Sequence, residues 1–274
     1  MNSYKIHKAI ALFGVPRSGT SWLGQIFNSS PQVAYRYQPL FSYEFKSRLK
    51  PGSPKKDIDN FHEDLLEAKS DFVLQKTNIS GNDTQNFKKS AIDTLVWKEV
   101  RYHNVVENLL SKDSGLKIVV IVRNPKSVIS SWYHAPKEFD KSKWNIENEW
   151  RNAERKNQGN PEEFNGYDKW KETTELYVKL KRKYSDRFYI IRYSDLLDDT
   201  YEEVKKLFGF CDIKYTKQTN DFIERSGSTD LSKDAYSVYR KNQTNDKWKN
   251  DLPSEIAKEI DNDLRGTELE QFNR

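Results

Sequence analysis

The chain has 274 residues, 32% of them charged and 13% aromatic, with a net charge of +5 at neutral pH. This length and aromatic content exclude a disordered chain and predict a single folded domain over residues 1–274. The lone cysteine excludes a disulfide framework and a cysteine-based zinc site within the chain, and without a long basic block we expect no nucleic-acid partner.

The first predicted element is an apolar strand, Ala9–Phe13, which follows a polar start. An apolar run of this length is too short for a secretory signal or a membrane span, and no later run is long enough either. We therefore expect a cytoplasmic protein without a membrane span. Later apolar runs predict strands at Lys117–Val122 and Phe188–Ile191, with Phe72–Gln75 and Thr94–Trp97 as weaker candidates.

Helical patterns lie between these strands. Apolar residues have helical spacing over residues 22–27, Thr200–Glu203 forms a capping box that opens a helix ending near Gly209, and Pro253 suits a first helical position. Strands that alternate with helices predict right-handed βαβ units. The expected fold class is therefore α/β: a single domain with a central, mostly parallel β-sheet flanked by helices, in a P-loop NTPase-like topology.

A loop with two glycines, Gly14–Trp22, joins the first strand to the helix that follows. Glycines let the backbone approach an anion, and a helix N-terminus offers free N–H groups to it. The glycine spacing matches a Walker A loop, but Thr20 stands where that loop has its lysine, and Arg17 places a cation inside the loop. The second strong strand ends in Arg123 where an ATP-binding fold has a magnesium-binding aspartate. We expect a phosphate-like group to bind here without a metal.

A second anion site is predicted after the strand Lys117–Val122. Arg123 stands at its carboxyl end, where open α/β sheets bind ligands. If Pro125 opens a helix, Ser131 lies about two turns into it and can donate to the anion that Arg123 contacts. A third basic segment, Tyr239–Asn242, is either a surface loop or a clamp for a nucleotide phosphate.

These residues resemble the sulfotransferases that use PAPS (3′-phosphoadenosine 5′-phosphosulfate). Gly14–Leu23 resembles the family's 5′-phosphosulfate loop in its P-R-S-G-T-[ST]-W form, and Arg123 with Ser131 resembles its 3′-phosphate pair at the same spacing. Arg240–Lys241 resembles a C-terminal R-K-G segment of the cytosolic branch, with Asn242 in place of the glycine.

The resemblance implies PAPS as co-substrate, no metal, and release of PAP (adenosine 3′,5′-bisphosphate). It implies that Arg17 contacts the bridging oxygen and the transferring sulfonate. The residues that it places around the nucleotide are Arg17, Ser18, Gly19, Thr20, Ser21, Trp22, Arg123, Ser131, Tyr193, Arg240 and Lys241.

The general base is the least defined position. The cytosolic branch carries K-T-H here; Lys98 matches its lysine, but Val100 stands at the histidine position. We expect Glu99 or Glu44 to act as the base, with His103 third. If residues 97–103 form a strand, Lys98 and Glu99 point to opposite faces of the sheet.

The expected acceptor is a carbohydrate or a small-molecule alcohol, or an amine. Arg17 favours the carbohydrate-modifying branch, whereas the C-terminal segment favours the small-molecule branch. Two other functions stay open: a kinase or NTPase with a degenerate loop, and a nucleotide- or glycan-binding protein without turnover. The sequence does not determine an oligomeric state.

Overall fold

The computed structural model describes residues 6–76, 87–229, 237–239 and 244–274. Across these ranges, no helix combines the length and the apolar character that crossing a membrane requires. The cytoplasmic location expected from the sequence stays a prediction.

The centre of the fold is a five-stranded sheet in the order β2-β3-β1-β4-β5, and all four strand pairings are parallel. The strands are β1 (Lys8–Phe13), β2 (Val33–Tyr37), β3 (Thr94–Glu99), β4 (Lys117–Val122) and β5 (Phe188–Arg192). The predicted α/β class with a parallel sheet flanked by helices is therefore confirmed. Since every strand runs the same way, the carboxyl ends of β1, β3 and β4 lie side by side at one edge.

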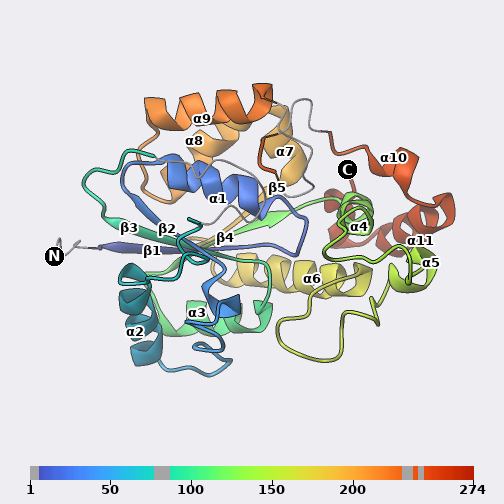
Figure 1. Ribbon diagram of the computed structural model, residues 1–274, viewed down its shortest axis with the longest axis horizontal. Coiled ribbons are helices and arrows are strands. Elements are labelled where there is room, and N and C mark those ends of the chain that lie inside the picture. The colour runs from blue at the N-terminus through green and yellow to red at the C-terminus, as the bar shows by residue number, and fades with distance from the viewer. Residues whose placement is uncertain (1–5, 77–86, 230–236, 240–243) are drawn as a thin grey trace.

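Helices cover both faces of this sheet (Figure 1). On one face lie α1 (Thr20–Ser29), α7 (Tyr193–Asp198), α8 (Thr200–Phe210) and α9 (Lys217–Ser228). On the other lie α2 (Lys55–Leu66), α3 (Val106–Lys112) and α6 (Tyr167–Lys183). Beyond the carboxyl ends of the strands lie α4 (Pro125–Tyr133), α5 (Ile146–Glu149), α10 (Trp248–Asp251) and α11 (Ser254–Leu264). The described ranges also contain the short 3-10 turns η1 (Pro39–Phe41), η2 (His103–Val105) and η3 (Glu268–Phe272).

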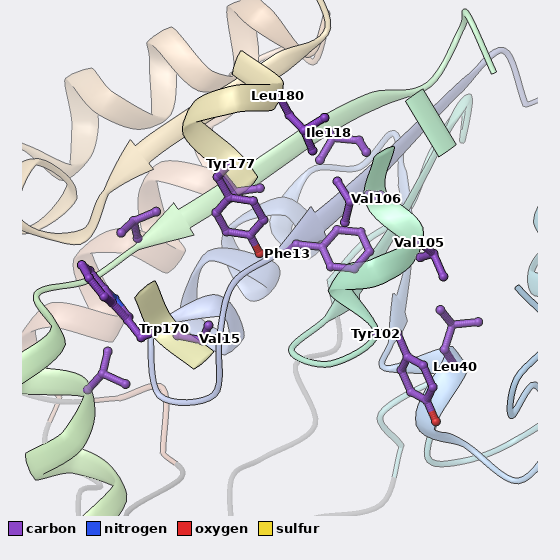
Figure 2. Packing of buried hydrophobic residues seen from close by; sticks show 14 of the residues in the cluster. Phe13, Val15, Leu40, Tyr102, Val105, Val106, Ile118, Trp170, Tyr177 and Leu180 are labelled. Atoms are coloured by element: carbon purple, nitrogen blue, oxygen red, sulfur yellow. The ribbon is translucent and has the colours of Figure 1, made fainter. Parts of the chain in front are cut away.

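Successive side chains of β1 point to opposite faces of the sheet, and both faces are buried, so the strand is continuously apolar. Ile10 and Leu12 join the hydrophobic cluster under α1, whereas Ala11 and Phe13 join the cluster on the opposite face. Figure 2 shows Phe13 pointing into that second cluster, among side chains from α3 and α6. A strand that is buried on both faces fixes the start of the loop that follows it.

One weak strand prediction is wrong and one strand was missed. Residues 72–75 form turns closed by local hydrogen bonds, such as Gln75 N–H to Phe72 C=O at 3.1 Å. The missed strand is β2, in which Arg36 interrupts the apolar pattern. The Arg36 guanidinium donates to the carbonyls of Leu65 and Leu66 at the end of α2, so a charged residue fits a sheet edge there.

The predicted helix starts need small corrections. The N-cap of α8 is Asp199, whose carboxylate accepts the Glu202 N–H, so the capping box does not start at Thr200. Pro253 precedes α11 as its N-cap instead of being its first residue. The helix predicted at Pro125 is confirmed, and the Asn124 side chain caps it.

Candidate active site

The loop after β1 contains two residues with a positive φ, one a glycine and the other an arginine. Gly19 has a φ of 100°, and a Cβ at this position would lie 2.7 Å from the Tyr193 ring. Arg17 has a φ of 73°, in the left-handed region that residues other than glycine rarely adopt. Such strain at a loop that opens a helix is typical of ligand sites.

The N-terminus of α1 has free hydrogen-bonding capacity. No side chain caps this helix. The N–H groups of Trp22 and Leu23 donate to the Gly19 carbonyl, which leaves those of Thr20 and Ser21 available to a ligand. Ser18 is fully buried, and its hydroxyl has no partner within the described part of the chain. A loop of this kind suits an anion with several acceptor oxygens.

Lys98 adds a buried cation beside this helix start. It is in register with Leu12 of β1, and its Nζ donates to Ser21 Oγ at 3.4 Å. The same Nζ lies 4.4 Å from the centre of the Tyr37 ring. Burial lowers the pKa of the Lys98 amine to about 7. An anion at this position would therefore gain strongly from binding next to a protonated Lys98.

The two anion sites predicted from sequence meet at Arg17. Its Nε donates to Ser131 Oγ at 3.1 Å, and its backbone carbonyl accepts from Arg123 Nη1 at 3.2 Å. Ser131 is on α4, which begins directly after the end of β4. The structure thus brings Arg17, Ser131 and Arg123 together.

Arg123 is held from several sides. Its guanidinium lies 4.6 Å from the centre of the Tyr193 ring, and its Nε donates to Asn245 Oδ1 at 3.3 Å. The Trp170 indole donates to the Arg123 carbonyl at 2.9 Å. These contacts fix the arginine at the carboxyl end of β4.

Trp22 and Tyr193, which the resemblance places around the nucleotide, also lie close together. Their ring centroids are 6.4 Å apart at an interplanar angle of 72°. The Trp22 indole donates to Ser226 Oγ of α9 at 3.0 Å. Both side chains are thus fixed beside the loop. Arg240 and Lys241 lie outside the described residues.

Each of the three candidate bases has a hydrogen-bond partner, but the second carboxylate oxygen of Glu99 has none within the described residues. Glu99 is fully buried, points away from Lys98 as predicted, and accepts the Leu40 N–H at 2.6 Å. Burial raises the pKa of the Glu99 carboxyl to about 8. Glu44 is exposed and accepts the backbone N–H of Ser70 at 3.0 Å.

His103, the third candidate, is part of the hydrophobic interior. Its Nδ1 lies 2.7 Å from the Tyr177 hydroxyl, and its Nε2 lies 3.2 Å from the Val100 carbonyl. Burial lowers the pKa of this imidazole to about 3, so the side chain is neutral at physiological pH. With both nitrogens engaged, it has a structural position.

One carboxylate beside the loop was missed by sequence reasoning. Glu138 Oε1 lies 3.5 Å from Arg17 Nη1, in the segment that follows α4. The only signal in the sequence is that Glu138 comes seven positions after Ser131. The structure describes no cluster of three or more His, Cys, Asp or Glu side chains that could hold a metal ion.

Comparison with known proteins identifies a family for the chain. A family model described as a sulfotransferase domain matches residues 7–273. Carbohydrate sulfotransferase 3 of Tetronarce californica is 21% identical over 322 aligned residues, which cover 93% of this chain and 70% of that protein.

Two solved structures share the fold. Mouse sulfotransferase SULT7A1, complexed with PAP, has a TM-score of 0.59 at 17% identity and covers 98% of this chain and 88% of its own. The sulfotransferase domain from the curacin biosynthetic pathway has a TM-score of 0.52 at 17% identity, and the match covers 95% of this chain and 98% of that domain.

Proposed function

The chain belongs to the sulfotransferase domain family, and we propose that it transfers a sulfuryl group from PAPS to a hydroxyl group of a carbohydrate, releasing PAP. The reaction is an in-line displacement in which the protein positions both substrates and stabilises charge. The carbohydrate acceptor is favoured by the relative named carbohydrate sulfotransferase 3 and by Arg17 in the phosphate loop.

The observation that carries the proposal is the hydrogen bond from Arg17 to Ser131. It joins the loop that suits a phosphosulfate to the helix that suits a second phosphate. PAPS carries such groups on its 5′ and 3′ positions, so one nucleotide can engage both sites. The free N–H groups of α1 and the unpartnered Ser18 hydroxyl fit this ligand.

Each residue takes a role that matches its position. The first turn of α1, with Ser18, Gly19, Thr20 and Ser21, would hold the 5′-phosphate, and Lys98 would add a positive charge beside it. Arg17 would stabilise the charge that develops on the sulfonate and the bridging oxygen.

The other end of the nucleotide would lie against a second group of residues. Arg123 and Ser131, with Arg240 and Lys241, would hold the 3′-phosphate. Trp22 and Tyr193 would contact the adenine. A bidentate contact from Arg123 and a hydrogen bond from Ser131 would favour a 3′-phosphate over a 3′-hydroxyl.

Calorimetry in EDTA tests the donor, because the proposed site uses no metal. PAP should bind and ATP should not, since Thr20 replaces the lysine that reaches the outer phosphates of ATP. Tighter binding of ATP than of PAP would favour a kinase or NTPase instead.

Turnover of PAPS with a panel of acceptors tests the transfer. We expect sulfated products with free sugars and glycan oligomers, and slower reaction with phenols. Reaction with phenols alone would favour the small-molecule branch. A protein that binds PAP but turns over no acceptor would be a binding protein.

A further inference from the structure

Glu138 lies in a turn that α4 holds in place. Its backbone N–H and that of Phe139 both donate to the Ala135 carbonyl at 2.8 Å. The Phe139 ring is buried against Trp132, with centroids 5.0 Å apart. The backbone of Glu138 is therefore fixed relative to Ser131, while its side chain keeps 21% of its surface exposed.

The Glu138 carboxylate faces the charged groups of the loop. It forms an ion pair with Arg17, and its charge also raises the pKa of Lys98 and of Tyr37, although burial has the largest effect on both groups. Four separate segments thus direct these side chains to one place: the loop after β1, the ends of β2 and β3, and the turn after α4.

Glu138 differs from the other candidate bases in its partner. Glu99 and Glu44 accept hydrogen bonds from backbone N–H groups. The partner of Glu138 is Arg17, the side chain that we assign to the sulfonate. If Arg17 contacts the sulfonate, a carboxylate 3.5 Å from that arginine would lie near the acceptor oxygen that attacks the sulfur.

We propose that Glu138 is the general base of the transfer, an inference that rests on the proposed function. Its carboxylate takes the proton of the acceptor hydroxyl while the acceptor oxygen forms its bond to sulfur. The bond between sulfur and the 5′-phosphate oxygen breaks in the same displacement, and PAP leaves with that electron pair. Arg17, which pairs with the carboxylate, would offset the negative charge of both the carboxylate and the sulfonate.

The test compares Glu138→Gln with the wild-type protein in two measurements. Calorimetry measures PAP binding, and PAP release from PAPS measures turnover, with the best acceptor of the panel and with water alone. We expect the dissociation constant of PAP to change by less than about threefold and kcat to fall by ~10²-fold or more. Glu154→Gln, the same change at an exposed position of the following segment, should leave both unchanged.

The Arg17→Ala background separates a base from a residue that only holds Arg17. If Glu138 acted only through Arg17, adding Glu138→Gln to Arg17→Ala would not lower kcat further, whereas the loss of a base should lower kcat in both backgrounds. Glu138→Asp should recover part of the lost kcat, because it keeps a carboxylate on the same turn. A Glu138→Gln protein that keeps more than a tenth of the wild-type kcat would overturn the inference and leave the proposed function standing. A wild-type protein that binds PAP but consumes no PAPS, even with water, would contradict both.

Discussion

Arg17 Nε donates a hydrogen bond to Ser131 Oγ at 3.1 Å, although 114 positions separate the two residues in the chain. This hydrogen bond connects the loop after β1 to α4, the helix after β4. Since both elements start at the carboxyl ends of neighbouring strands, the parallel sheet itself fixes this distance. Two anion sites on one rigid edge are what a nucleotide with two separate anionic groups needs.

Arg17→Ala should lower turnover much more than product binding. PAP lacks the sulfonate that we assign to Arg17, so its dissociation constant should rise only a fewfold. The kcat for PAPS should fall by ~10²–10³-fold, the usual cost of a lost charge-stabilising donor. If PAP affinity and kcat fell by the same factor, Arg17 would contribute to nucleotide binding alone.

Arg123→Ala should remove the preference for a 3′-phosphate. A hydrogen bond to a charged group contributes about 1.5–3 kcal/mol, so PAP should bind ~10–100-fold more weakly. AMP, which has no 3′-phosphate, should bind as it does to the wild type. Asn245→Ala should have a smaller effect of the same kind, because Asn245 only orients the arginine. Calorimetry with both nucleotides gives the ratio, and an unchanged ratio would contradict the assignment.

The buried Lys98 predicts a pH dependence of PAP binding. Its pKa is lowered from 10.5 to about 7 by burial, and bound anions favour the protonated amine. Affinity for PAP should therefore be highest below pH 7 and should decrease as the pH rises above 7. Lys98→Met should remove this decrease and weaken binding at low pH. If the affinity of Lys98→Met for PAP still decreased above pH 7, another group would be responsible for the pH dependence.

The same residue predicts how stability changes with pH. Between pH 7 and 10.5 the unfolded chain binds a proton at Lys98 that the folded chain does not, so the free energy of unfolding should rise with pH over this window. Denaturant unfolding of the ligand-free protein at several pH values measures it. The rise should be smaller in Lys98→Met, and an equal rise in both proteins would contradict the prediction.

Gly19→Ala should damage both stability and nucleotide binding. The new Cβ would require a left-handed φ and would lie 2.7 Å from the Tyr193 ring, so the cost should be about 1–3 kcal/mol. Gly209→Ala is the matched control, because its Cβ would meet nothing within 4 Å inside α8. That control should be neutral or stabilising by about 0.5–1 kcal/mol. Equal melting temperatures for the two variants would contradict this reading.

The parts of the fold that depend on local patterns could be predicted from the sequence. β1, β4 and β5 are continuous apolar runs, and the helix after Pro125 has an ordinary N-cap. β2 was missed because Arg36 breaks its pattern, and its guanidinium finds carbonyl partners only in the tertiary structure. Local propensity cannot anticipate a partner that lies 30 positions away.

The candidate site also contains residues that the sequence could identify and residues that it could not. The loop with Arg17 has a local signature, and Arg123 with Ser131 has a fixed spacing that could be compared with a family. Glu138 carries no signature, since its relation to Arg17 arises only when α4 packs at the sheet edge. Glu99 and His103 looked suitable in sequence, but burial gives both of them other partners.

The most direct test of sulfuryl transfer is mass spectrometry of a reaction that contains the wild-type protein, PAPS, a panel of glycan acceptors and EDTA. PAP and one sulfated acceptor should form in equal amounts without a metal, and almost none of either should form with Arg17→Ala. Intact PAPS with every acceptor, or a product formed only with ATP and magnesium, would contradict sulfuryl transfer.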